Sequence, residues 1–230
     1  RACLPRPMIR RTRPILLVLG PAGSGKTTLG RSLAARGLQH LDLDTPPGRV
    51  GPDDAPDALR EGIATLFQRA RVGPLALAIE SMDGHRERRG TVVTFSSVET
   101  LPPRHAAAVE RAGFDLVVLY GTGADVLDGY LARERAAGRA APPDHWIAHN
   151  AASYAQFSAP HHAPHRVTTY RDGRFVGADG LVAAVTSHLA RRNPQWSGLA
   201  LQANPGAGRG DGAVPFAPDE PARSTSVGRR

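Results

Sequence analysis

The sequence predicts a three-layer α/β/α fold built around a mostly parallel five-stranded sheet. Short apolar stretches alternate with longer stretches of helical periodicity along most of the 230 residues. Two of the short stretches, residues 15–19 and 115–120, are almost continuously apolar. That pattern is typical of strands buried on both faces of a parallel sheet. Repeated strand–helix units therefore predict a sheet with helices packed on both sides.

The predicted elements are bounded by glycine, proline or aspartate. Strands are expected at residues 15–19, 39–43, 91–95, 115–120 and 167–170, the last continuing through Asp172-Gly173 into a hairpin with residues 174–176. Helices are expected at residues 26–36, 56–71, 74–88, 102–112, 125–137, 144–158 and 180–191. Part of one helix, residues 75–80, also fits a strand. Residues 138–143 and the histidine-rich stretch after 158 are predicted to be loops.

A glycine-rich loop lies between the first strand and the first helix. Residues 20–28 spell G-P-A-G-S-G-K-T-T, which fits the phosphate-loop pattern G-x-x-x-x-G-K-[ST]. Lys26 is the only lysine among 29 Lys and Arg residues, so a compact ammonium stands where a phosphate cradle needs one. In this pattern the backbone N–H groups surround phosphates at a helix N-terminus. We therefore expect a P-loop NTPase fold in which a nucleoside triphosphate is bound by Gly20, Pro21, Ala22, Gly23, Ser24, Gly25, Lys26, Thr27 and Thr28. The alternative is a glycine-rich turn that binds nothing.

The positive charge lies mostly at the two ends of the chain. The net charge is +8, yet residues 14–190 hold 18 basic and 18 acidic residues. A globular nucleic-acid-binding protein carries its basic face on the folded part, so nucleic acid is not the expected partner, apart from salt-sensitive contacts of the ends. We interpret residues 1–13 as a basic extension, 14–192 as one domain, and 193–230 as a disordered tail rich in Gly, Pro, Ala, Ser and Arg.

Cysteine content and hydropathy set the expected compartment. The single cysteine, Cys3, permits no disulfide within the chain, which is consistent with a reducing, cytoplasmic location. No apolar run approaches the ~20 residues needed to span a bilayer, and the first residues lack the apolar stretch of a signal peptide. We therefore expect no membrane contact.

Several classes of nucleotide-binding protein are excluded by missing motifs. The guanine-reading N-K-x-D motif needs a second lysine, and the L-S-G-G-Q signature of transport ATPases does not occur. The strands at 91–95 and 115–120 do not lead into an acidic residue, so the metal-holding carboxylate is not in the usual Walker B place. The remaining candidates are Asp42 and Asp44, which follow the second strand.

With these motifs, residues 14–190 resemble the small P-loop kinases that phosphorylate metabolites, of the shikimate kinase and gluconate kinase type. The resemblance rests on the phosphate loop, on the D-x-D of Asp42 and Asp44, on F-S-S-V at 95–98 followed by Arg104, and on L-A-R-E-R at 131–135 with Arg139. It implies a helical lid, ATP and Mg²⁺ as cofactors, and transfer of the γ-phosphoryl group to a hydroxyl of a small-molecule acceptor. Shikimate kinases have Gly-Gly-Gly where this chain has Ser96-Ser97, so the resemblance names no acceptor.

The resemblance also implies roles for individual residues. Thr27 and Asp42 would hold Mg²⁺, and Asp44 would bind the acceptor hydroxyl and accept its proton. Lys26 and the lid arginine Arg133 would stabilise the transferred phosphoryl group. The other contacts are assigned to the nucleotide for Arg139 and to the acceptor for Ser96, Ser97 and Arg104. For the arginines, a solvated helix face is an equally good interpretation.

Other interpretations remain open for the histidines and for the function. His145 and His149 are four residues apart, which is a spacing that can bind a metal ion. A separate group of histidines lies among prolines at 161–165, and we interpret these as surface residues. A nucleotide or nucleic-acid 5′-hydroxyl kinase is a second possible function. A non-catalytic ATP-gated binding protein is a third.

Overall fold

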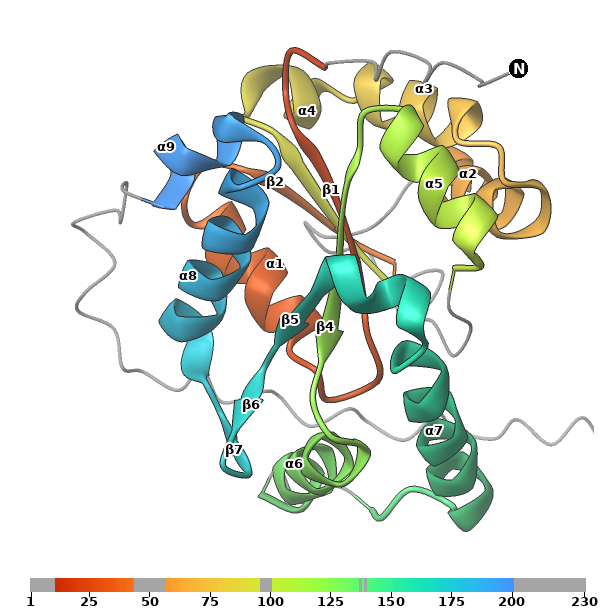
Figure 1. Ribbon diagram of the computed structural model, residues 1–230, viewed down its shortest axis with the longest axis vertical. Helices are drawn as coiled ribbons and strands as arrows, with labels where there is room; N and C mark the ends of the chain where they lie inside the picture. The colour runs from red at the N-terminus through yellow and green to blue at the C-terminus, as the bar shows by residue number, and fades with distance from the viewer. Residues whose placement is uncertain (1–10, 44–56, 96–100, 137, 139, 201–230) are drawn as a thin grey trace, which may run out of the picture.

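The computed structural model describes residues 11–43, 57–95, 101–136, 138 and 140–200 (Figure 1). A five-stranded parallel sheet with the order β2-β3-β1-β4-β5 forms its centre. The strands are β1 (Ile15–Leu19), β2 (Gln39–Asp42), β3 (Thr91–Thr94), β4 (Asp115–Tyr120) and β5 (Arg166–Thr168). In the central register, Leu16 of β1 lies between Val92 and Asp115. The predicted α/β fold and all five predicted strands are confirmed.

Helices cover both faces of the sheet because its strands are apolar on both faces. Leu17 and its alternate neighbours pack against α2 (Asp57–Arg69), α3 (Gly73–Ser81) and α5 (Pro103–Arg111). Leu16 and Val18 pack on the other side, against α1 (Lys26–Ala34) and α8 (Gly177–Ala190). The two helical layers stand on either side of the sheet in Figure 1. Every side chain of β1 is fully buried, so the loop that follows β1 starts from a rigid support.

Two further helices lie at the end of the sheet where the strands finish. They are α6 (Gly123–Ala136) and α7 (Asp144–Phe157), drawn below the sheet in Figure 1. A small cluster of Val126, Tyr154 and Tyr170 joins them to the short hairpin of β6 (Tyr170–Arg171) and β7 (Arg174–Phe175). The predicted Asp172-Gly173 turn is confirmed, with both residues at positive φ. The hairpin is a separate two-stranded sheet rather than a continuation of β5.

Two segments differ from the sequence-based expectation in detail. The helical interpretation of 74–88 is confirmed, but extended backbone at Met82 divides it into α3 and α4 (Asp83–Glu87). The histidines after 158 are not surface loop residues: they form a 3-10 helix, η1 (Pro160–His165), in which His162 and His165 are buried. His162 packs against Phe157, with ring centroids 6.4 Å apart. The local sequence is polar and proline-rich, so only the tertiary packing explains this burial.

The folded part of the chain extends further than expected at both ends. Residues beyond 192 form η2 (Pro194–Trp196) and α9 (Ser197–Ala200), and the boundary at 192 is therefore too early. Trp196 is fully buried, and its indole N–H donates to Asp115 Oδ2 at 2.7 Å. Arg11, expected in the basic extension, donates from Nε to the backbone oxygen of Ala112 at 2.9 Å. The remainder of both ends lies outside the described residues, and the division into extension, domain and tail otherwise stays a prediction.

No helix among the described residues combines the length and the apolar character needed to cross a bilayer. The cytoplasmic location stays a prediction.

Candidate nucleotide-binding site

The glycine-rich loop takes the shape that an anion-binding nest requires. Gly23 and Gly25 both have positive φ, 83° and 95°, a region in which L residues are strained. A Cβ on Gly23 would also lie 2.7 Å from the backbone oxygen of Val126 and 2.9 Å from Cβ of Tyr130. Gly25 is the N-cap of α1. The loop therefore delivers its backbone N–H groups to the positive end of a helix, where a phosphate chain binds best.

Two polar side chains of the loop are buried beneath it. Lys26 is 5% exposed, and its Nζ donates to the backbone oxygens of Gly20 at 2.9 Å and Pro21 at 3.0 Å. Ser24 is fully buried, and within the described residues its hydroxyl has no hydrogen-bond partner. An unpaired buried hydroxyl of this kind is costly, and Ser24 is not among the residues that line the cavity described below. The ammonium of Lys26 is thus held against the backbone of the loop.

A cavity of about 170 Å³ opens between the loop and α6. Its lining comes from the phosphate loop on one side and from the helix on the other: Ala22, Gly23, Gly25, Lys26, Thr27, Thr28, Tyr130 and Arg133. Six of these are predicted nucleotide-binding residues, and Arg133 is a predicted catalytic residue. The fold therefore brings the phosphate loop and one predicted lid arginine to a single cavity.

The two residues predicted to hold Mg²⁺ lie next to each other. The Thr27 hydroxyl donates to Asp42 Oδ2 at 3.2 Å. The two come together because α1 packs closely on β2: a Cβ on Gly30 would lie 2.1 Å from Nε2 of His40. A hydroxyl and a carboxylate beside a phosphate site are the oxygen ligands that Mg²⁺ takes, together with nucleotide phosphates. The donor set therefore fits the expected ion.

The guanidinium of Arg133 lies over an aromatic ring beside the cavity. It contacts Glu134 Oε1, from Nε at 3.2 Å and from Nη2 at 3.1 Å, and it sits 5.0 Å from the ring centroid of Tyr130. The Tyr130 ring stacks in turn on Trp146 of α7, with centroids 4.8 Å apart. The Arg133 side chain is nevertheless 62% exposed, so its charge is available to a ligand. Arg135, by contrast, turns back to the backbone oxygen of Leu131 on its own helix.

The predicted acceptor site is described only in part. Asp44, Ser96, Ser97 and Arg139 lie outside the described residues, and their roles stay predictions. Arg104 is exposed on the first turn of α5. The structure thus neither joins Arg104 to the phosphate loop by a contact nor tests its predicted role.

An arginine that no sequence motif marks lies near the end of β2. Arg60 of α2 donates from Nη1 to the backbone oxygen of Leu43 at 3.3 Å. This contact places a guanidinium beside the residue that follows Asp42. Nothing in the local pattern singles out Arg60, because α2 is an ordinary amphipathic helix in an arginine-rich chain.

Two tyrosines that no sequence motif marks also contact the phosphate loop. The hydroxyl of Tyr154 donates to the backbone oxygen of Ala22 at 3.2 Å, and that of Tyr170 to the oxygen of Gly23 at 3.1 Å. Burial raises the pKa of Tyr154 to about 12, helped by the neighbouring Tyr170 and Tyr130 hydroxyls. The pKa of Tyr170 is raised by burial as well, although Arg133 opposes that shift. Both hydroxyls therefore remain protonated donors at neutral pH.

The described residues contain no group of three or more His, Cys, Asp or Glu side chains arranged to hold a metal ion.

Two curated proteins with sequences similar to this chain are shikimate kinases. No protein-family model matches the chain. A shikimate kinase of Stenotrophomonas maltophilia strain R551-3 is 32% identical over 103 residues, which cover 44% of this chain and 53% of that protein. The shikimate kinase of strain K279a is 31% identical over 103 residues, with the same shares of both chains. The chain thus matches these curated relatives over about half of their length.

Two solved structures are among those similar to this chain. A gluconokinase from Sinorhizobium meliloti 1021 has 20% sequence identity and a TM-score of 0.48, covering 82% of this chain and 98% of its own. A shikimate kinase from Acinetobacter baumannii in complex with shikimate has 17% identity and a TM-score of 0.40, covering 81% and 95%. The sequence matches, together with the phosphate loop, confirm the resemblance of this chain to small P-loop kinases of the shikimate kinase type.

Proposed function

We propose that this protein is an ATP-dependent kinase that transfers the γ-phosphoryl group to a hydroxyl of a small metabolite. One observation carries the proposal: the phosphate loop, the Thr27–Asp42 pair and Arg133 come from separate elements and gather at one end of the sheet. The similarity to shikimate kinases supports the reaction class.

The chemistry that these residues supply is mainly positive charge in fixed positions. Phosphoryl transfer needs an in-line arrangement and stabilisation of the charge on the moving group. The loop amides and Lys26 would bind the β- and γ-phosphates, and the exposed guanidinium of Arg133 would reach the transferred group across the cavity. Mg²⁺, held through Thr27 and Asp42, would neutralise phosphate charge. Asp44 would orient the acceptor hydroxyl and take its proton.

The charges around the end of β2 bear on the acceptor. Arg60 donates to the backbone beside Asp42, and Arg104 begins the helix that follows β3. Both are cations that can bind polar groups of an acceptor. Arg60 and Arg104 are therefore candidates to bind polar groups of a small hydroxylated metabolite.

The test is a transfer assay on the full chain. Purified protein with Mg²⁺ and ATP is offered sugars, sugar acids, cyclitols, shikimate, gluconate, aminoglycosides and nucleosides, and ADP release is measured. We expect one acceptor class to raise ADP release well above the rate of an Arg133→Met variant. Arg135→Met is the matched control, because Arg135 is an exposed arginine two residues away that bonds to its own helix.

Two outcomes contradict the proposal. ATP binding in calorimetry without acceptor-dependent ADP release favours a nucleotide-gated binding protein. Activity confined to nucleosides or to nucleic acids with a 5′-hydroxyl favours a nucleic-acid or nucleotide kinase.

A further inference from the structure

Three of the four tyrosines in this chain surround the phosphate loop. Tyr130 of α6 packs against Gly23, where a Cβ would lie 2.9 Å from its own Cβ. Tyr154 of α7 and Tyr170 of β6 donate their hydroxyls to the backbone oxygens of Ala22 and Gly23, at 3.2 and 3.1 Å. Two consecutive peptide groups of the loop are therefore held by side chains from two elements distant in the sequence.

These bonds fix the direction of two backbone N–H groups. A peptide group is planar and trans, so its N–H points away from its C=O. The C=O of Ala22 shares a peptide group with the N–H of Gly23, and the C=O of Gly23 shares one with the N–H of Ser24. Holding both oxygens toward the tyrosines turns the N–H of Gly23 the other way, whereas the N–H of Ser24 donates to the backbone oxygen of Pro21 at 3.2 Å. The loop needs that orientation of the Gly23 N–H to bind an anion.

The surroundings of the two hydroxyls are built to hold them. Tyr154 is 6% exposed and Tyr170 is 8% exposed. A Cβ on Gly129 of α6 would lie 2.4 Å from the Tyr170 hydroxyl, so only glycine leaves room for it there. Gly121 makes similar room, since a Cβ on it would lie 3.1 Å from Cδ2 of the same ring. A ring that only filled space would not need its hydroxyl accommodated in this way.

We propose that Tyr154 and Tyr170 are positioning residues of the nucleotide site, which hold the peptide groups after Ala22 and Gly23 so that the loop keeps its shape and the N–H of Gly23 faces the phosphate chain. The inference rests on the nucleotide binding in the proposed function. It adds two residues to the site that do not touch the ligand themselves. Removing a hydroxyl leaves the loop covalently intact but frees a peptide group to rotate, which weakens binding of the phosphates.

The experiment uses Tyr154→Phe, Tyr170→Phe and the double variant in the full chain. Dissociation constants for ATP and for inorganic tripolyphosphate, both with Mg²⁺, are measured by calorimetry. Each single variant is expected to bind both ligands about threefold to tenfold more weakly, the worth of one hydrogen bond, and the double variant more weakly still. Tripolyphosphate separates an effect on the phosphate cradle from one on the nucleoside.

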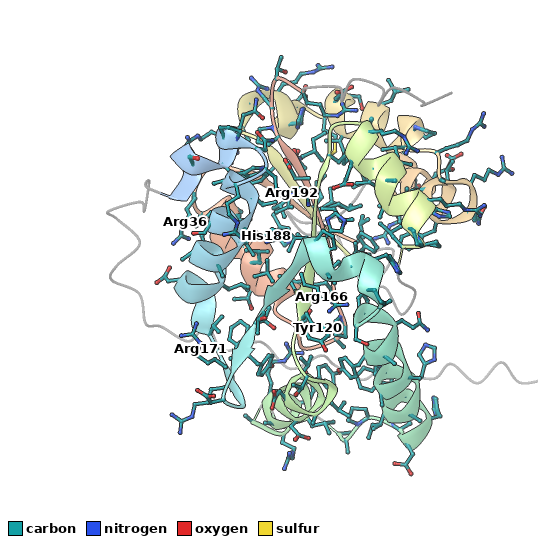
Figure 2. All side chains as sticks on the ribbon, viewed as in Figure 1. Arg36, Tyr120, Arg166, Arg171, His188 and Arg192 are labelled. Carbon is teal, nitrogen blue, oxygen red and sulfur yellow. The ribbon has the colours of Figure 1, made fainter. Side chains whose placement is uncertain are left out.

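Tyr120→Phe is the matched control. Tyr120 ends β4, and its side chain packs with the core cluster on the face opposite α1, where its ring lies 5.1 Å from the Arg166 guanidinium (Figure 2). This variant is expected to keep the wild-type affinity. In addition, the ¹⁵N–¹H signal of Gly23 is expected to shift on tripolyphosphate binding in the wild type, and to shift less in the variants. A purely structural role would lower the midpoint of thermal unfolding without changing these ligand-induced shifts.

Wild-type affinity in the double variant overturns the proposal, and so does an equal loss in Tyr120→Phe. Failure of the proposed function would be seen in the wild-type protein, independently of the tyrosine variants. If the wild-type protein itself binds neither ATP nor tripolyphosphate, there is no nucleotide site to position. If the wild type binds both and no acceptor is phosphorylated, the positioning role still stands.

Discussion

Each end of the sheet has a cavity lined by charged residues. The two ends differ in whether the polar groups there have hydrogen-bond partners. At the carboxyl end, the phosphate loop and Arg133 surround about 170 Å³, and the buried Ser24 hydroxyl has no partner within the described residues. At the amino end, a cavity of about 230 Å³ is lined by polar groups that pair with each other. There Asp115 accepts from Asn193 and Trp196.

The charged groups of the amino end are paired in the same manner. Arg192 forms an ion pair with Glu110 and hydrogen-bonds to His165, and Arg11 pairs with Glu80. Arg192 lies in the upper part of the molecule in Figure 2, in the part opposite α6. The larger cavity is thus surrounded by groups that already satisfy one another. Cavity size alone therefore does not locate function, whereas donors arranged to meet a ligand do.

The largest effect is expected when the Lys26 ammonium is removed from the carboxyl end of the sheet. Lys26→Ala should lower kcat/KM for the acceptor substrate by about a thousandfold, since a positive charge that would bind the phosphates is removed. Lys26→Arg should not restore activity, because a planar guanidinium does not fit the same loop. Steady-state kinetics measure both. An active Lys26→Arg enzyme would contradict the role given to this ammonium.

At the amino end, a substitution should affect stability and leave the ligand site unchanged. Asp115→Ala leaves the Trp196 indole N–H and the Asn193 amide without their acceptor, and the free energy of unfolding should fall by about 4 kcal/mol. Denaturant unfolding measures this, with ATP affinity of the folded variant as the control. A changed ATP affinity would show that Asp115 influences the site at the other end of the sheet, which contradicts the distinction drawn between the two ends.

The contact between α1 and β2 can be tested with a single methyl group. Alanine favours helices over glycine by about 1 kcal/mol, yet a Cβ on Gly30 meets the His40 ring at 2.1 Å. Overpacking should win and destabilise Gly30→Ala by about 3 kcal/mol, and it should weaken Mg²⁺-dependent ATP binding by separating Thr27 from Asp42. Gly73→Ala is the matched control, since open space surrounds that position. Equal stability of the two variants would show that α1 is not tightly fitted.

The smallest effect is a pH dependence from a third region. Burial lowers the pKa of His162 to about 4, and His161, His165 and Arg166 add to the shift. The unfolded chain binds a proton near pH 6.5 and the folded chain only near pH 4, so stability falls as the pH drops through this window. This residue should account for a loss of about 2 kcal/mol between pH 7 and pH 5. Unfolding curves of the wild type and His162→Phe measure it; equal pH slopes would refute it.

The parts of this fold that the sequence predicted are those with local signals. The turn of the glycine-rich loop, the all-apolar β1 and the Asp172-Gly173 turn each depend on neighbouring residues, and the structure contains all three. The contact of Tyr154 with Ala22 spans 132 residues of chain and that of Tyr170 with Gly23 spans 147. No periodicity or spacing encodes such contacts. The burial of Trp196 was missed for the same reason, because its partner Asp115 is 81 residues away.

The candidate site divides along the same line. Lys26, Thr27 and Asp42 follow from motifs, and the structure brings Thr27 and Asp42 within hydrogen-bond distance. Arg133 was assigned to the transferred phosphoryl group through the resemblance, and the structure places it at the cavity beside the phosphate loop, whereas Arg135 bonds to its own helix. Asp44, Ser96, Ser97 and Arg139 stay predictions, since they lie outside the described residues.

The stacking of Trp146 on Tyr130 has a practical consequence. The chain has two tryptophans, and they occupy opposite ends of the sheet: one beside the phosphate loop, the other locked against Asp115. Their ultraviolet emission therefore supplies two intrinsic optical reporters without any label. With Trp196 replaced by phenylalanine, the remaining signal should report, in real time, on the surroundings of Trp146 alone when ATP is added.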